Sequence, residues 1–150
     1  MEVDSQELIR ILKDKIVLYQ HLGIEVVKID SHEVRFKVSL EKNKNHKGTA
    51  FGGSLYATGV LASYALVLAG LHERQIPTEN IVIAKGEIQY LRPVDTDFEV
   101  VCCFPSLQEE EDFFSELKTK GKVRGALTTQ IFGGGGSLKA SLTGVFVVKL

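Results

Sequence analysis

The sequence has few of the residues that mark secreted, membrane-bound or nucleic-acid-binding proteins. Its 150 residues include two cysteines, three prolines, one methionine and no tryptophan. Eighteen basic and nineteen acidic side chains leave a formal net charge of −1, so no overall field favours nucleic acid or an anionic membrane. The N-terminus lacks a basic segment followed by an apolar one, so we predict no signal peptide and expect a cytoplasmic protein.

The two cysteines, Cys102 and Cys103, are adjacent in an apolar run. Neighbouring residues of a strand point to opposite faces, which argues against a disulfide between them. Two free thiols suit a reducing compartment. We expect a buried structural pair rather than a catalytic thiol, because a buried free cysteine behaves as a small hydrophobe.

Motifs that bind metals or nucleotides are also missing. His72-Glu73 is not followed by the second histidine of an HExxH zinc helix. The four glycines at 133–136 are followed by neither GKS nor GKT and are flanked by strand patterns, so they predict a mobile hairpin turn rather than a phosphate loop. We therefore expect no cofactor and no metal.

What the chain does have is a long stretch without charge, from Gly48 to Leu71. A helix that is apolar on nearly all sides is buried on nearly all sides. Within it, the apolar run from Leu55 to Leu71 is short for a membrane span, which needs about 20 predominantly apolar residues, and it is rich in small and hydroxyl side chains. We therefore predict a central helix that the rest of a soluble protein surrounds.

The start of this helix is the most informative place in the sequence. Gly52-Gly53 forms an entry without side chains, and Ser54 follows directly. The first amides of a helix have no intrahelical partner and carry the positive end of the helix dipole. Glycine lets a ligand approach the backbone closely. The segment is thus a candidate site for an anion or a developing oxyanion.

The remaining segments predict two surface helices and six strands. Asp4 or Ser5 is expected to cap the first helix, and the acidic run at 109–112 is explained by the dipole of the second, without a metal or a partner. The expected helices cover 5–22 and 106–120, and the expected strands 24–30, 33–40, 81–91, 97–104, 122–132 and 137–150. The order predicts a single α+β domain, residues 1–150, in which an antiparallel sheet of about six strands wraps the central helix.

This order resembles the hotdog fold, and two motifs carry the resemblance. One is AFGGSL at 50–55, and the other is IQYLRPV at 88–94, which looks like the strand that ends in Leu-Arg-Pro in hotdog thioesterases. An asparagine-rich loop, GTAFGGS at 48–54 and KGKVR at 120–124 make the chain most similar to the thioesterase domains that also form the C-terminal half of acetyltransferase fusions.

The resemblance implies hydrolysis or binding of an acyl thioester on coenzyme A or acyl carrier protein. In such folds an amide at the start of the central helix polarises the thioester carbonyl, and Gly53 matches that position. Water then attacks, usually activated by a carboxylate two turns into the helix. Here that place falls near Val60, and no Asp or Glu lies between Gly48 and Leu71.

Few other residues are candidates for activating water. Asn45 and His46 lie just before the helix and are either a water-orienting pair or a polar turn. Glu87 lies on the strand that lines the partner's site in the family's dimers, and its alternative role is a surface charge pair. As nucleophiles, Ser54 and Thr49 lack a visible base.

Further residues are assigned to substrate binding, although apolar aromatic side chains are more often part of a plain core. These residues are Thr49, Phe51, Gly52, Ser54, Tyr64 and Tyr90.

Three functions fit these residues. The first is an acyl-thioester hydrolase, and the second is a hotdog domain that binds thioesters or only dimerises, which the missing helix acid favours. A dehydratase would need a histidine and an acid, and His46 with Glu87 is the only pair available. Uncovered sheet edges invite uncontrolled pairing, so we expect a homodimer or tetramer.

Overall fold

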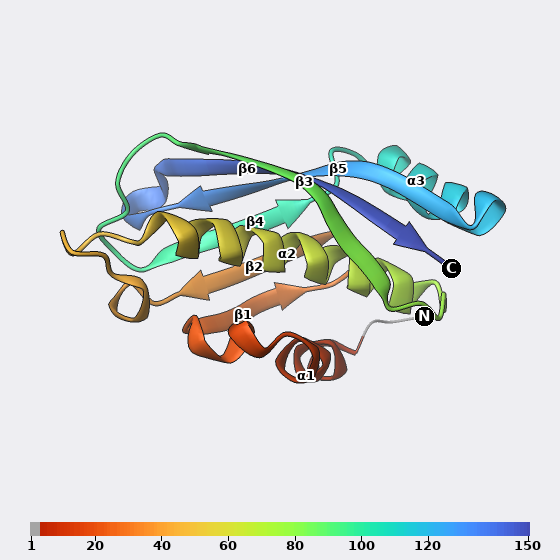
Figure 1. Ribbon diagram of the computed structural model, residues 1–150, viewed down its shortest axis with the longest axis horizontal. Helices are drawn as coiled ribbons and strands as arrows, with labels where there is room; N and C mark the ends of the chain where they lie inside the picture. The colour runs from red at the N-terminus through yellow and green to blue at the C-terminus, as the bar shows by residue number, and fades with distance from the viewer. Residues whose placement is uncertain (1–3) are drawn as a thin grey trace.

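The computed structural model describes residues 4–150 (Figure 1). The main helices and strands closely follow the predicted order. The α-helices are α1 (Ser5–Lys15), α2 (Gly52–Glu73) and α3 (Leu107–Lys120). The strands are β1 (Ile24–Ile29), β2 (Glu33–Val38), β3 (Asn80–Tyr90), β4 (Phe98–Cys103), β5 (Lys122–Phe132) and β6 (Leu138–Lys149). Short 3-10 turns are η1 (Val17–His21), η2 (Glu41–Asn43) and η3 (Gly134–Gly136).

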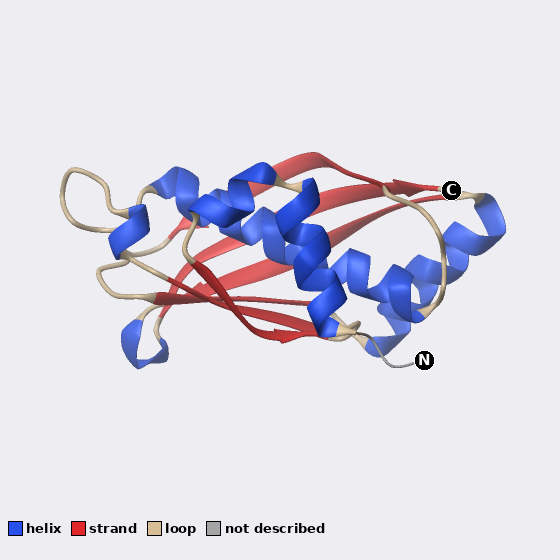
Figure 2. Cartoon of the chain, turned by 90° about the horizontal axis from the view of Figure 1, so that it is seen from below, coloured by secondary structure: helices blue, strands red, loops and turns tan. Residues whose placement is uncertain are grey.

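All six strands form one antiparallel sheet in the order β1-β2-β4-β5-β6-β3. Strands β1 and β3 are therefore its edges. The sheet curves around α2, which contacts every strand (Figure 2). The predicted α+β architecture, with an antiparallel sheet wrapped around a long central helix, is confirmed.

Helix α2 is the core of the molecule. It is long and apolar enough to cross a bilayer by length and composition, but 72% of its most apolar window is buried inside the protein, as in the core helix of a globular fold. Its buried hydroxyls are satisfied locally. Thr58 donates to the Ser54 carbonyl at 2.8 Å, and Ser63 donates to the Gly59 carbonyl at 3.0 Å. A buried hydroxyl without such a partner would be costly.

The predicted N-terminal helix at 5–22 is wrong in its second half. Asp4 caps α1 as expected, accepting from the amides of Gln6 and Glu7 at 3.0 and 3.3 Å. At Ile16, however, the backbone is extended (φ −119°, ψ 98°), and the chain continues as the 3-10 turn η1. Ile16 and Val17 are both β-branched and form helix poorly, and the break lets Tyr19 turn into the core.

Only one of the two cysteines is buried. Cys102 lies in the core, whereas Cys103 is exposed. Burial raises the pKa of the Cys102 thiol to about 11, so it stays protonated and inert. The expectation of two buried thiols was wrong because successive residues of β4 face opposite sides of the sheet.

Glycines end elements where the chain needs a left-handed conformation. Gly121 closes α3 with φ 74°. The predicted hairpin between β5 and β6 is confirmed, and two of its four glycines, Gly135 and Gly136, have φ of 77° and 79°.

Candidate active site

Helix α2 begins with backbone amides that the protein leaves open. The amides of Ser54 and Leu55 both donate to the carbonyl of Phe51, at 2.9 and 3.2 Å. Within the described residues, the preceding amides of Gly52 and Gly53 have no acceptor, and no side chain caps this end. Two donors therefore remain at the positive end of a 22-residue helix.

Two aromatic rings explain why both positions are glycine. A Cβ on Gly52 would lie 3.3 Å from the hydroxyl and Cζ of Tyr90. A Cβ on Gly53 would lie 2.5 Å from Cε2 of Phe51. The rings thus lie against the two α-carbons, and a larger residue has room only if a ring moves.

A cavity of about 320 Å³ opens beside the start of α2. Its lining includes the polar residues Thr49, Tyr90 and Arg92, together with Gly52 at the helix start. The rest of its wall consists of Ala50, Leu55, Leu91, Pro93 and Val94. The sequence motifs at 50–55 and 88–94 therefore meet in one place, but none of the described residues that line this cavity carries a carboxylate or an imidazole.

The loop before α2 is held closed by Asn45. Its side-chain amide donates to the Thr49 hydroxyl at 2.9 Å, and its Oδ1 accepts from the amides of Lys47 and Thr49 at 2.9 and 3.1 Å. These bonds favour the polar-turn interpretation of Asn45 over a role in orienting water. His46 sits in the same loop and is exposed.

Glu87 lies away from the helix start. It pairs with Thr143 across β3 and β6, between Gly86 and Ile88, which pair with Gly144 and Leu142. Gly86 abuts the Tyr56 side chain of α2, so Glu87 must project from the opposite, outer face of the sheet. The structure does not bring Glu87 and the α2 start together within one chain.

A second cavity, of about 440 Å³, runs along the side of α2. Tyr56, Val60 and Tyr64 follow one another at four-residue spacing on this face, and Leu18 of η1 and Ile83 of β3 also line the cavity. The other lining residues are Ile16, Ala57, Leu61, Ile81 and Phe146. We call it the apolar groove. Burial raises the pKa of Tyr64, and among residues 4–150 no acid or histidine lines the groove.

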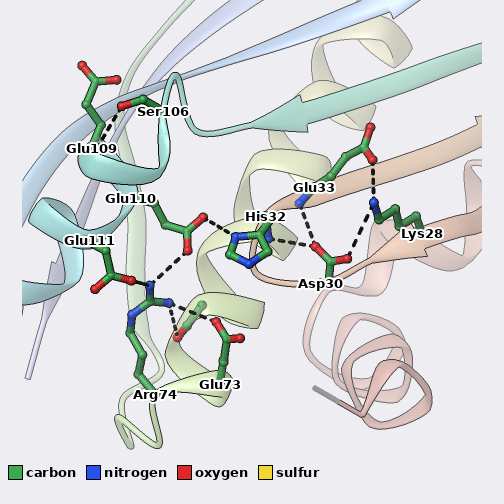
Figure 3. A network of polar contacts seen from close by, with 11 residues as sticks. Lys28, Asp30, His32, Glu33, Glu73, Arg74, Ser106, Glu109, Glu110 and Glu111 are labelled. Atoms are coloured by element: carbon green, nitrogen blue, oxygen red, sulfur yellow. Dashed lines mark hydrogen bonds and ion pairs between the residues drawn. The ribbon is translucent and has the colours of Figure 1, made fainter. Parts of the chain in front are cut away.

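Sequence reasoning missed a polar cluster at the far end of α2 (Figure 3). Glu110 has a side chain that is only 3% exposed, and it accepts from Arg74 at 3.0 Å and contacts His32 Nδ1 at 2.9 Å. Arg74 also pairs with Glu111 at 2.6 Å and lies 4.2 Å above the Phe114 ring.

The interpretation of the acidic run at 109–112 without a partner was therefore wrong for its two central residues. Ser106, not an acid, caps α3, and the dipole does not explain why Glu110 is buried. Within residues 4–150, no group of acidic, histidine and cysteine side chains could hold a metal ion.

Comparisons with known proteins identify the family. A family model described as "Putative thioesterase (yiiD_Cterm)" matches residues 5–150. The chain belongs to this thioesterase family. None of the curated proteins matches it.

Several solved structures resemble this chain over nearly its whole length. A Chlorobaculum tepidum protein of unknown function is 28% identical, with a TM-score of 0.88 over 97% of this chain and 93% of that one. A Shewanella oneidensis protein described as a "putative thioesterase" is 24% identical, with a TM-score of 0.84 over 97% and 96%. A Pseudomonas aeruginosa protein described as a "Probable Thioesterase" is 18% identical, with a TM-score of 0.82 over 99% and 97%. The resemblance to the hotdog thioesterases is confirmed.

Proposed function

We propose that this protein hydrolyses an acyl thioester carried by coenzyme A or by acyl carrier protein. The supporting observation is the pair of unpaired amides at Gly52 and Gly53, which open beside a cavity in a member of a thioesterase family. As water attacks the thioester, negative charge develops on the carbonyl oxygen. Preorganised amides at a helix start stabilise that charge, and Gly53 is the main donor in this proposal.

The apolar groove suits the acyl group. Gly53 and Tyr64 are eleven residues apart on α2, which corresponds to about 16 Å along the helix. Tyr56 and Val60 lie between them on the face that lines the groove. An acyl chain that leaves a carbonyl held at Gly53 can follow this face, so Tyr64 would contact its distal carbons.

Arg92 suits the carrier. Arg92 lines the cavity at the helix start, and its guanidinium has no ion-pair partner within residues 4–150. Coenzyme A and the phosphopantetheine of acyl carrier protein both carry phosphate, which arginine recognises well. The two free thiols suit the reducing cytoplasm, where we place the protein.

A second function, thioester binding without turnover, is favoured by one observation. Within the part of the chain that the structure describes, neither the cavity nor the apolar groove is lined by a carboxylate or an imidazole. Val60 occupies the position near which the relatives implied by the resemblance carry the acid. A dehydratase has less support, because Glu87 faces the outer side of the sheet and His46 lies in the loop before α2.

A hydrolysis panel separates these functions. Acyl-CoAs from short to long chain are incubated with the wild type, with heat-inactivated protein and with Gly53→Val, and thiol release is followed. Enzyme-dependent release that falls in Gly53→Val supports the hydrolase. Saturable binding of an acyl-CoA without release would instead support the binding function.

We also propose that the protein is a homodimer or a tetramer. Strand β3 is an edge strand of eleven residues, and Val82 on it is 55% exposed. A long open edge needs a cover, and a second copy of the same strand provides one. The apolar groove lies beside this edge, so a partner chain would help to close it.

A further inference from the structure

The hydroxyl of Tyr90 contacts the start of α2 at one specific atom. Strand β3 runs back along α2, so its last residue lies near the first turn of the helix (Figure 1). From there the Tyr90 hydroxyl donates to the carbonyl oxygen of Gly52 at 2.8 Å. The ring of Tyr90 also lies against the α-carbon of Gly52.

That carbonyl belongs to the same peptide unit as the amide of Gly53. Resonance couples the two ends of a peptide, so a donor on the oxygen increases the partial positive charge on the N–H. Hydrogen bonds in series strengthen one another, by perhaps 10–30% per bond. The Tyr90 hydroxyl therefore acts on the electronic character of the Gly53 amide as well as on its direction.

Other bonds already hold this end of the fold. The Phe51 amide donates to the Asn43 carbonyl at 2.7 Å, and the Ala50 amide donates to the Val94 carbonyl at 2.8 Å. Beyond β3, the Leu91 amide donates to the Lys139 carbonyl at 2.8 Å. Because these backbone bonds fix both the loop and the strand end, the Tyr90 hydroxyl is not needed to attach one to the other.

The hydroxyl also remains a donor at working pH. Partial burial raises the pKa of Tyr90, and the neighbouring Tyr56 raises it further. The phenol therefore stays protonated well above neutral pH, and its proton can remain on the Gly52 carbonyl.

We infer that Tyr90 is a positioning residue that orients and polarises the Gly52–Gly53 peptide for the thioester carbonyl. The inference rests on the proposed function and adds a role that differs from lining an acyl pocket. Removing the hydroxyl weakens the hydrogen bond that the Gly53 amide donates to the oxyanion, and this bond is made in the transition state. Ground-state binding of the acyl group stays largely unchanged. The expected result is a lower kcat at constant KM.

The test is Tyr90→Phe, which keeps the ring against Gly52 and removes only the hydroxyl. We expect kcat to fall about threefold to tenfold, the range that corresponds to a typical net hydrogen bond, with KM unchanged. Tyr19→Phe is the matched control, because Tyr19 is a largely buried tyrosine in η1, away from the cavity. Its kcat should equal that of the wild type.

Nuclear magnetic resonance provides a measurement that does not depend on turnover. Losing the donor on the Gly52 carbonyl should move the Gly53 amide nitrogen to lower frequency, with little change at amides far from the helix start. In the control, the Gly53 signal should stay in place. If the wild type hydrolyses no thioester, the proposed function has failed and this signal alone decides the inference.

Two results would overturn the inference in an active enzyme. One is a wild-type kcat in Tyr90→Phe, and the other is an unmoved Gly53 signal. A raised KM at wild-type kcat would assign Tyr90 to the acyl pocket instead. Tyr90→Leu completes the series, since it also removes the ring and should change KM only if the ring contacts the substrate.

Discussion

At Gly53 the space for a side chain is already filled by the ring of Phe51. We predict that Gly53→Val lowers turnover at least about tenfold, a conservative part of the loss expected when one oxyanion donor is removed. The added carbons must displace the ring, and together they block the approach of the carbonyl. Phe51 is 58% exposed, so the ring can swing outward and the helix should still form. Steady-state kinetics and far-UV circular dichroism measure the two effects.

Gly53→Ala serves as the graded control, because its single methyl group displaces the ring less. Its loss of activity should lie between those of the wild type and Gly53→Val. If the folded valine variant keeps wild-type activity on its best thioester, the carbonyl is held elsewhere.

Val60 is partly buried and faces the apolar groove. We predict that Val60→Asp folds, loses about 1–3 kcal/mol of stability and hydrolyses thioesters faster than the wild type. The groove admits water to the carboxylate, which then stands where related enzymes activate water. Thermal unfolding and thiol release test the two parts.

Ala69→Asp is the matched control for Val60→Asp on the same helix. Ala69 is fully buried, so an unpaired carboxylate there should cost more than about 4 kcal/mol and prevent folding. Equally severe unfolding of Val60→Asp would place Val60 in dry core and remove the argument that it belongs to the site.

Asn43 is 3% exposed, and its side-chain amide donates to the carbonyls of Leu22 and Ser39 at 2.8 and 2.7 Å. Asn43→Asp should cost about 2–4 kcal/mol, because a carboxylate would face two buried carbonyls without a proton to share. Asn45→Asp is the control. The hydroxyl of Thr49 can turn and donate to it, so its cost should be smaller. Chemical denaturation compares the two, and equal costs would contradict the argument.

Individual polar residues were the least predictable part of the molecule. Asn43 and Asn45 stand in the same basic loop, and only the folded backbone shows that one is buried and the other half-exposed. Glu110 looked like any acid in the first turn of a helix. Its partners are 36 and 78 residues away in the sequence, so no local pattern indicates them.

Among elements, α3 is fastened to the rest of the fold by charges that include a histidine. The hydrogen bond to Glu110 raises the pKa of His32, and the charges of Glu110, Glu73 and Asp30 raise it further, whereas partial burial opposes them. Arg74 also faces Glu110, and Lys28 faces Asp30. Protonated His32 therefore forms an ion pair with Glu110 that links the β1–β2 turn to α3.

We predict that the ion pair between His32 and Glu110 weakens as the pH rises. A raised pKa in the folded state means that the stabilisation is fully present below the ordinary histidine pKa of about 6.5 and is lost as the pH passes through the higher, folded value. The Tm of the wild type should exceed that of His32→Gln on the acid side, and the difference should shrink on the alkaline side.

Glu110→Gln is the second single variant of a double-mutant cycle with His32→Gln. In that background, His32→Gln should change Tm by an amount that varies much less with pH. A wild-type advantage that is constant with pH would show that His32 acts through packing alone.

Elements were predicted best where the pattern was long. The extent of α2 followed from a charge-free run. The predicted helix at 5–22 was wrong beyond residue 15, because Leu8, Leu12, Ile16 and Tyr19 continue a helical spacing. The backbone at Ile16 is set by how Tyr19 packs, which is a tertiary contact.

At the scale of the whole molecule, the unpaired edge of β3 predicts a dimer. Light scattering at micromolar concentration should show at least twice the chain mass of 16.6 kDa. A particle of 16.6 kDa would contradict the shared-edge arrangement. The measurement is repeated on Gly53→Val, whose assembly should match that of the wild type because the added side chain meets the ring of Phe51 and not a residue of β3.

The exposed thiol of Cys103 makes the chain easy to follow without engineering. Its neighbour Cys102 is buried in the core and has a pKa of about 11. A maleimide dye added to the folded protein should therefore react with a single cysteine on each chain, Cys103. In denaturant the same reagent should react with both cysteines. Cys103 stands on β4, two strands away from β6 and three from β3 in the sheet. In an assembly of two copies, a pair of such dyes would therefore report the distance between the two Cys103 positions, without any change to the native sequence.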